Sequence, residues 1–311
     1  MPHSSKSKTK PSNKLMRHCT FDAIGTRWNI EISEPVSNFT YGKLLGDIKK
    51  RIEEFDKNYS RFRDDSLVTI MSKSPGIYEL PADAKLLLDL YEQLYLLTHG
   101  AVTPLIGQAL VNAGYDTLYS LQPKEMQATP SWEEVVDYAF PTLALKQPAL
   151  LDFGAAGKGY LVDIIAEIIE RRGIRSYGID AGGDILYRNA KDEAVEVGLE
   201  HPKDPSLAVG IAKIRNQSLC GSSIYKRAWG SYHHIIDPAN GKSPKEIAAV
   251  WVVADSTLLA DGLTTALFFI PASTLQQQYN FDYAIVRADL SLETSANFPA
   301  HFFNQQEVVY A

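Results

Sequence analysis

Apolar side chains in the first half of the chain recur mostly at the spacing of an α-helix. A first stripe consists of Leu45, Ile48, Ile52 and Phe55. This spacing of three and four residues predicts a helix with one buried face. A second helix is predicted after Pro81, because proline is common at helix starts; its stripe consists of Leu87, Leu90, Leu94 and Leu97. The polar run YSRFRDDS at 59–66 predicts a loop, and the capping-box spacing of Ser131 and Glu134 predicts a further short helix.

The second half of the chain is rich in β-branched residues, which form short runs bounded by turn residues. The predicted strands are Val195–Leu199, Leu207–Ile214, Ala248–Val253, Tyr283–Val286 and two short strands within 177–187 that meet at Gly182-Gly183. The segment Phe21–Ser33 is predicted to form an opening strand that is interrupted at Gly25, because a glycine within a strand usually marks a β-bulge. Because these elements do not alternate regularly between strand and helix, the pattern predicts an α+β fold with largely antiparallel sheets packed with helices.

The stretch Leu151–Asp163, with the sequence LDFGAAGKGYLVD, contains three glycines around Lys158. An apolar entry precedes the glycines and a helical period follows them, so the stretch predicts a strand, a glycine turn and a helix. Glycine lets a backbone turn sharply and approach a ligand closely, and a helix N-terminus favours an anion. The stretch is therefore a candidate anion site, although such a turn can also serve only to join a strand to a helix.

The run GSYHHIIDPANGKSP at 230–244 places two histidines before a turn. In an extended segment His233 and His234 point to opposite sides, so at most one of them faces a given site. An imidazole titrates near neutrality, which suits a general base or a phosphate partner. The alternative interpretation is a hydrogen-bonded structural histidine.

The run ADGLTTALFF at 260–269 predicts a buried helix in which Asp261 and Thr265 share one face. A carboxylate and a hydroxyl suit Mg²⁺, which usually keeps several waters and is also held by substrate phosphates. Too few carboxylates cluster here for a calcium site made by protein ligands alone. The alternative is an aspartate that caps a helix, with a threonine that bonds back to its own helix.

Composition and charge narrow the class of protein. The 311 residues are 45% hydrophobic and carry a net charge of −6, which allows a sizeable core and argues against nucleic acid as a partner. The basic residues of the N-terminal region, Lys6, Lys8, Lys10, Lys14 and Arg17, occur in a run rich in serine and lysine. Residues 1–16 are therefore predicted to be a disordered basic tail, and residues 17–311 to form the folded domain.

The residues after the tail do not resemble an export signal. The tail is followed by HCTFDAIG rather than by an apolar segment, and Cys19 follows Arg17 and His18, which argues against a lipoprotein anchor. No apolar run approaches the length of a membrane span. Cys19 and Cys220 are the only cysteines, so neither a disulfide framework nor a cysteine metal site is implied. These observations predict a cytoplasmic protein without stable membrane insertion.

Taken together, the motifs resemble those of the ApbE family, the FAD:protein FMN transferases, from Phe21 to Phe269. The matching segments, all in the family's order, are IGT (24–26), SRFRDDS (60–66), GAVTPLIG (100–107), LDFGAAGKGYLVD (151–163), IDAGGDI (179–185), VGLEHP (197–202), SSIYKR (222–227), HHIIDPANG (233–241) and ADGLTTA (260–266). Each segment is weak evidence by itself, but nine in register are highly specific. The resemblance implies an ApbE-like, T-fold-like architecture.

The resemblance also implies an activity. Such an enzyme cuts the pyrophosphate of its substrate FAD with the help of Mg²⁺, attaches FMN to a threonine hydroxyl of an acceptor flavoprotein and releases AMP. Two alternatives remain open. One is a FAD pyrophosphatase, in which water replaces the acceptor hydroxyl; the other is a flavin-binding protein without catalysis.

By motif position, the resemblance assigns roles to individual residues. Mg²⁺ would be held by Asp261, Thr265 and the carbonyl of Ala155, with Thr264 at a neighbouring position that some relatives use. His234, rather than His233, would be the base for the acceptor hydroxyl. The FAD site would be lined by Ile24, Phe62, Ala101, Val102, Thr103, Asp152, Lys158 and Ile235.

The chain departs from the family's pattern mainly where the flavin is expected to bind. Ile24 replaces a usual methionine, and Thr103 stands where a carboxylate is common. Three further departures are Ser66-Leu67, Gly221-Ser222-Ser223 and Ala113-Gly114-Tyr115. The metal pair, His234 and Lys158 are retained, so the flavin contacts are less well defined than the metal and phosphate chemistry.

Overall fold

A computed structural model describes residues 16–303 and 309–310 of the chain. The predicted basic tail, residues 1–16, lies outside the described residues except for Met16. Among the described residues, no helix has both the length and the apolar character that crossing a membrane requires.

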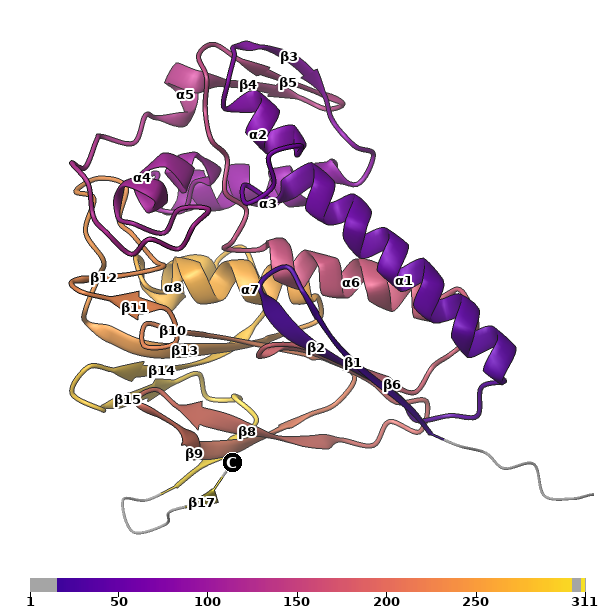
Figure 1. Cartoon of the computed structure of the whole chain (residues 1–311). Helices are drawn as coiled ribbons and strands as arrows, with labels where there is room; N and C mark the ends of the chain where they lie inside the picture. Colours follow the sequence, from indigo (N-terminus) through magenta and orange to yellow (C-terminus); the bar gives the residue numbers. More distant parts are fainter. Residues whose placement is uncertain (1–15, 304–308, 311) are drawn as a thin grey trace, which may run out of the picture.

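An eight-stranded sheet forms the centre of the fold (Figure 1). Its order is β1 (Arg17–Ala23), β2 (Thr26–Ile32), β6 (Tyr177–Ala181), β7 (Asp184–Arg188), β10 (Ser218–Ser223), β13 (Ile247–Ala254), β14 (Asp282–Arg287) and β15 (Leu292–Thr294). Each neighbouring pair of strands is antiparallel. The predicted α+β class with antiparallel sheet is confirmed. The pattern did not predict β10, whose sequence SLCGSS has little β-branched character.

The prediction of one interrupted strand over Phe21–Ser33 is wrong. The segment forms two antiparallel strands, and the residues between them, Ile24 and Gly25, have positive φ angles of 41° and 75°. Such angles at both central positions are typical of a tight hairpin turn. For a β-branched residue such as Ile24, this backbone conformation is strained.

Helices cover one face of this sheet (Figure 1). The predicted helices correspond to α1 (Asn38–Tyr59), α3 (Ala84–Leu97), α6 (Gly157–Glu170) and α7 (Thr257–Ala266). In α1 the buried stripe includes Leu44, and Leu45 is only half-buried. Helix α7 packs on β10 and β13, α6 packs beside α7, and α1 packs on α6. The predicted strand at the start of Leu151–Asp163 is absent: residues 151–153 join no sheet, and the N–H of Asp152 donates to the carbonyl of Pro104 at 2.7 Å.

A second sheet lies on the opposite face of the main sheet (Figure 1). It contains β16 (Ala300–Phe302), β9 (Asp204–Ile214) and β17 (Val309–Tyr310), and β8 (Val195–His201) also pairs with β9. Apolar side chains of both sheets, among them Leu199, Leu219 and Trp251, form a core between them. The strand runs predicted in the second half of the chain are thereby confirmed.

Shorter elements surround the helices. These are α2 (Leu67–Met71), β3 (Gly76–Glu79), the 3₁₀ turn η1 (Pro104–Ile106), α4 (Gly107–Asn112), α5 (Trp132–Val135), β4 (Val136–Ala139), β5 (Thr142–Leu145), β11 (Ala228–Trp229), β12 (Tyr232–His233) and α8 (Ala272–Leu275). The predicted capping box at the start of α5 is present, with both Ser131 and Glu134 engaged. Strands β3, β5 and β4 form a small sheet.

Candidate functional site

Two adjoining hollows form a continuous cleft. They share the lining residues Leu110, Asp152, Gly154, Lys158, Gly182, Lys226, Arg227 and His234. One hollow, of about 790 Å³ including space open to solvent, contains Asp261 and Thr265. The other, of about 1770 Å³ by the same measure, has an aromatic wall that includes Phe62, Tyr115 and Tyr119.

The cleft brings together the residues that the motifs single out, with one exception. Those that line it are Ile24, Phe62, Ala101, Val102, Thr103, Asp152, Ala155, Lys158, His234, Ile235, Asp261 and Thr265. Thr264 lines neither hollow. Its buried hydroxyl donates to the carbonyl of Asp261 at 2.7 Å and lies 2.8 Å from the hydroxyl of Ser222.

Two aspartates, Asp163 and the buried Asp261, hold α6 and α7 together. Asp163 on α6 accepts hydrogen bonds from the N–H groups of Thr257 and Leu258 at the start of α7. Conversely, Asp261 on α7 accepts the N–H of Gly159, in the first turn of α6, at 2.9 Å. Each carboxylate thus satisfies free donors at the other helix's N-terminus. The predicted anion site at the start of α6 is therefore partly filled by the chain's own Asp261.

Gly159 allows this close approach of the two helices. A Cβ atom at this position would lie 2.2 Å from the carbonyl oxygen of Thr257 and 2.7 Å from the Cβ of Asp261. Both contacts are far shorter than van der Waals distance, so a larger residue would push α7 away. The glycine of the GKGY motif therefore fixes where Asp261 stands in the cleft.

A partly buried cation and two buried carboxylates meet beside the first hollow. Lys158 is paired with Asp184 and lies 4.0 Å from Oδ1 of Asp261. Burial alone would lower the pKa of Lys158, but Asp184 and Asp261 raise it above its ordinary value. Burial, and then the charge of Asp184, raise the pKa of Asp261 to about 7. Oδ1 of Asp184 is buried without a hydrogen-bond partner among the described residues. A cation bound between the two carboxylates would offset the repulsion that raises the pKa of Asp261.

Three of the four residues predicted to hold Mg²⁺ fit such an ion, and Thr264 is the exception. Asp261 and Thr265 are one helical turn apart on α7 and line the same hollow as Ala155. The N–H of Ala155 donates to the hydroxyl of Tyr91 at 3.2 Å, which anchors the backbone at this residue. The donor set consists of oxygens, as Mg²⁺ prefers, and it leaves positions for waters and a ligand's phosphates. No cluster of three or more His, Cys, Asp or Glu side chains suited to a metal occurs among the described residues.

The two adjacent histidines have different surroundings, as the alternation predicts. Nε2 of His233 lies 2.7 Å from the carbonyl oxygen of Pro244, and Nδ1 accepts the N–H of Ile235 at 3.3 Å. His234 instead lines both hollows, and its Nδ1 is buried without a partner in the described part of the chain. Burial, followed by the charge of Arg227, lowers the pKa of His234 well below its ordinary value. The imidazole is therefore neutral at pH 7 and able to accept a proton.

The aromatic wall of the second hollow surrounds a buried arginine. Nε of Arg61 donates to Oδ2 of Asp152 at 2.5 Å, and the guanidinium carbon lies 4.2 Å from the ring centre of Phe62 and 5.0 Å from that of Tyr115. The terminal nitrogens of Arg61 are buried without hydrogen-bond partners among the described residues. The rings of Phe62 and Tyr119 stack with their centres 5.4 Å apart. This wall suits a flat aromatic ligand.

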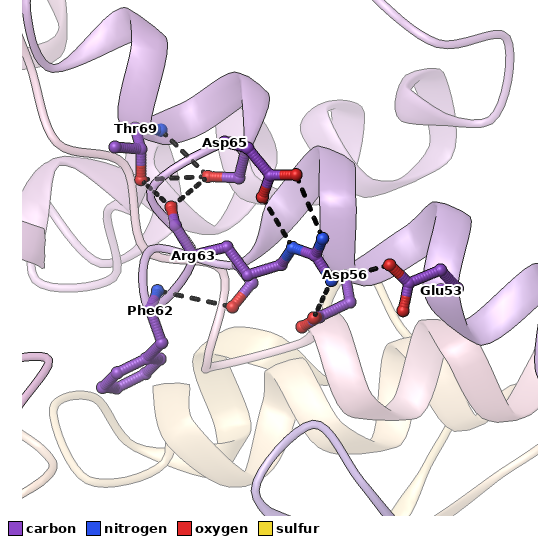
Figure 2. Close-up of polar contacts among 8 residues, drawn as sticks. Glu53, Asp56, Phe62, Arg63, Asp65 and Thr69 are labelled. Atoms are coloured by element: carbon purple, nitrogen blue, oxygen red, sulfur yellow. Dashed lines mark hydrogen bonds and ion pairs between the residues drawn. The ribbon is translucent and has the colours of Figure 1, made fainter.

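The loop that carries Phe62 is anchored by Arg63 (Figure 2). The guanidinium of Arg63 donates to both carboxylate oxygens of Asp65, and also to Asp56 and Glu53 on α1. Ser66 caps α2 by accepting the N–H of Thr69. In Figure 2 the ring of Phe62 points away from this ionic cluster. The polar residues of SRFRDDS thus attach the loop to α1 and α2 and hold its aromatic ring toward the cleft.

The GAVTPLIG segment is held by hydroxyl groups. The hydroxyl of Thr98 accepts the N–H of Val102 at 2.9 Å, and the hydroxyl of Thr103 accepts the N–H of Leu105 at 3.2 Å, which caps η1. Thr103, which departs from the family's usual carboxylate, therefore has a local structural role.

Sequence reasoning missed several residues that line or shape the cleft. Asp184, Arg61 and Arg227 lie within quoted motifs, and a search of those motifs for further charged residues could have found them. Tyr119 has no local signal, because it reaches the cleft only through the fold, whereas Tyr115 lies in a segment whose departure from the family's pattern already pointed to the flavin contacts.

Comparison with known proteins places the chain in a family. A family model described as the ApbE family matches residues 24–284. The chain is 25% identical over 281 residues to a FAD:protein FMN transferase of Vibrio cholerae, covering 83% of this chain and 82% of the relative. It is 28% identical over 280 residues to a FAD:protein FMN transferase of Treponema pallidum, covering 79% and 76%.

Solved structures share the fold. The ApbE protein of Thermotoga maritima superposes with a TM-score of 0.79 at 19% identity, covering 91% of this chain and 97% of that one. The apo flavinyl transferase ApbE of Pseudomonas stutzeri superposes with a TM-score of 0.73 at 19% identity, covering 93% and 98%. The family model spans most of the chain and the architecture agrees, so this protein belongs to the ApbE family.

Proposed function

We propose that this protein is a Mg²⁺-dependent FAD:protein FMN transferase. It would move FMN from FAD to a threonine hydroxyl of an acceptor flavoprotein and release AMP. The observation that carries the proposal is a single cleft that joins the acid–hydroxyl pair of α7, the neutral imidazole of His234 and an aromatic wall. Family membership and the activity named for the curated relatives support it.

In this proposal the chain's residues bind and orient the dinucleotide. Phe62 and its aromatic neighbours hold the flavin ring, and Ile24 borders it at the hairpin turn. Lys158 and Arg227 neutralise the phosphates, which is the main requirement for phosphoryl transfer. Asp261, Thr265 and the carbonyl of Ala155 would hold Mg²⁺, which supplies charge stabilisation at the pyrophosphate.

His234 would act on the acceptor. The threonine oxygen forms a bond to the phosphorus of the FMN half, and the bond from that phosphorus to the bridging oxygen breaks. The threonine proton goes to His234, and AMP leaves with the bridging oxygen and takes up a proton. The low pKa of His234 keeps the base unprotonated at neutral pH.

A transfer assay tests this proposal. The protein is incubated with FAD, Mg²⁺ and the flavin-free acceptor domain of a flavoprotein, and the acceptor is weighed by mass spectrometry. We expect the mass of one FMN on a threonine and an equal amount of AMP. Asp261→Ala should abolish transfer. His234→Ala should slow transfer by roughly 100-fold or more while FAD still binds.

The other outcomes decide between the alternatives. FMN that appears only free in solution would identify a FAD pyrophosphatase, and FAD that binds but stays intact would identify a non-catalytic binder. The cytoplasmic location stays a prediction; finding the protein in a periplasmic fraction would contradict it.

A further inference from the structure

A third hollow lies between the two sheets and meets the cleft. Its walls come from β7, β8, β10 and β13 and include Ile185, Val197, Leu219 and Trp251. It shares Gly182, Gly221, Ser222, Ser223 and Lys226 with the hollow that contains Asp261. The space between the sheets is therefore continuous with the candidate site, which lies on the helix-covered side of the main sheet.

The connection exists because β10 extends three residues past the start of its partner β7. Strand β7 pairs only with Ser218, Leu219 and Cys220 of β10. It begins directly after the turn at Gly182-Gly183 that joins it to β6. The last three residues of β10, 221–223, pair with β13 on the other side. No strand of the described chain pairs with these three residues on the β7 side. Such an open edge can accept an extended peptide through its backbone groups.

The junction of hollow and cleft cannot carry larger side chains. A Cβ on Gly182 would lie 2.0 Å from the hydroxyl of Thr26, and one on Gly221 would lie 3.0 Å from the Trp251 ring. An ion pair of 2.9 Å joins Lys226, at the junction, to Glu200 on β8. The junction thus combines a glycine floor, open backbone groups and a charged pair, which suits a polypeptide backbone with small side chains.

We propose that the acceptor's segment around its target threonine binds in this hollow. The segment lies extended between the sheets, adds as a short strand to residues 221–223, and enters the cleft past Gly182. There the threonine hydroxyl reaches the phosphate of the FMN half of FAD, which His234 and Lys158 would border. This inference rests on the proposed transferase function, in which the aromatic half of the cleft holds the flavin, so that the acceptor needs a separate entrance.

A pair of variants on β8 tests the hollow. Val197 and Val195 are both half-buried against the inter-sheet core, but only Val197 lines the hollow. Val197→Phe should therefore narrow it, whereas Val195→Phe is the matched control on the same strand face. The assay uses an acceptor domain that the wild-type protein modifies. We expect Val197→Phe to raise the KM for the acceptor about tenfold or more, with the affinity for FAD unchanged. Val195→Phe should keep the wild-type KM.

Hydrogen exchange gives an independent readout on the unaltered protein. The probe is the same acceptor domain with its target threonine replaced by alanine, which binds without reacting. We expect slower exchange of backbone amides within 219–224 when FAD, Mg²⁺ and this domain are present than with FAD and Mg²⁺ alone.

Two results would contradict the docking proposal and leave the transferase proposal valid. One is a wild-type acceptor KM for Val197→Phe. The other is protection confined to another surface, such as the one that carries the exposed apolar residues Leu118 and Leu121. If the wild-type protein transfers FMN to no acceptor at all, the transferase proposal itself fails.

Discussion

At the scale of single residues, Asp261 combines three roles. Its carboxylate caps α6, faces Lys158 and Asp184, and borders the cleft. Burial and the neighbouring Asp184 raise its pKa to about 7, from an ordinary value of 3.8. A group that is costly to ionise in the folded protein gains most from a bound cation, which is consistent with the proposed metal role.

The pKa of Asp261 predicts how Mg²⁺ binding depends on pH. Below pH 7 a proton competes with the metal, so the Kd for Mg²⁺ should rise about tenfold for each pH unit; above pH 8 it should level off. Isothermal titration with Mg²⁺ between pH 5.5 and 8.5 measures this, and Asp261→Asn is the control that should show weak, pH-independent binding. A wild-type Kd that is constant over this range would contradict the prediction.

The raised pKa of Asp261 also affects the stability of the metal-free protein. Whereas Mg²⁺ binding strengthens as the pH rises, this stability contribution weakens. Because the pKa of Asp261 is higher in the folded state, this group's contribution to stability is present below about pH 4 and is lost as the pH rises through 7. The pKa of His234 is lowered in the folded state, so its contribution to stability is present above about pH 6.5 and is lost as the pH falls below that value. In the folded protein the lowered pKa keeps this imidazole neutral near neutrality. At saturating Mg²⁺ the transfer rate should therefore vary little between pH 6 and 8.

At the scale of elements, the reciprocal capping of α6 and α7 sets the geometry of the site. Asp163 accepts two backbone N–H groups and the hydroxyl of Ser256, all at the start of α7. Burial raises the pKa of Asp163, which these donors counteract. Loss of this carboxylate would leave the N–H groups unsatisfied and loosen the helix that carries Asp261.

Asp163→Ala should therefore destabilise the protein by about 2 kcal/mol. Urea unfolding followed by circular dichroism measures the change. Asp255→Ala is the matched control, because Asp255 is exposed at the end of β13 next to the same helix and should cost less than about 0.5 kcal/mol. Equal effects of the two substitutions would show that the capping contacts contribute little.

In the loop 60–66, polar residues fix the position of an aromatic side chain. Arg63 holds the loop by contacts with three carboxylates, and Phe62 faces the cleft (Figure 2). We expect Arg63→Met to weaken FAD binding several-fold while the protein stays folded, because the ring of Phe62 would lose its fixed position. Fluorescence titration with FAD measures this. Arg171→Met, at the exposed end of α6, is the control and should leave FAD affinity unchanged.

At the scale of the whole molecule, the cleft is assembled from segments that are far apart in the sequence. The β1–β2 turn, the loop 60–66, η1, α6, the loop after β10 and α7 all contribute to its lining. A ligand that fills the cleft would therefore hold much of the fold together rather than one local element.

This arrangement predicts a cooperative rise in thermal stability with ligand. FAD and Mg²⁺ at 100 times the Kd should add about 2.7 kcal/mol to the free energy of unfolding, seen as one transition at a higher Tm in differential scanning calorimetry. AMP alone, which lacks the flavin, should raise the Tm less. An unchanged Tm at saturating FAD and Mg²⁺ would argue against binding in this cleft.

Local sequence patterns correctly predicted the elements whose buried face can be read from the spacing of their own residues. The stripes of α1 and α3, the runs of β8, β9, β13 and β14, and the capping box at Ser131 are of this kind. Strand β10 and the β1–β2 hairpin were not predicted as such, because pairing with neighbouring strands defines β10 and a strained Ile24 backbone allows the turn.

The sequence by itself determined the family resemblance, the α+β class and the residue types of the candidate site. Only the tertiary structure decided that Asp184 lies against Lys158 and that Asp261 caps α6. It also placed Thr264 outside the cleft. The physical reason is that charge and hydrogen-bond partners depend on contacts between residues far apart in the chain, whereas periodicity records only which face of each element is buried.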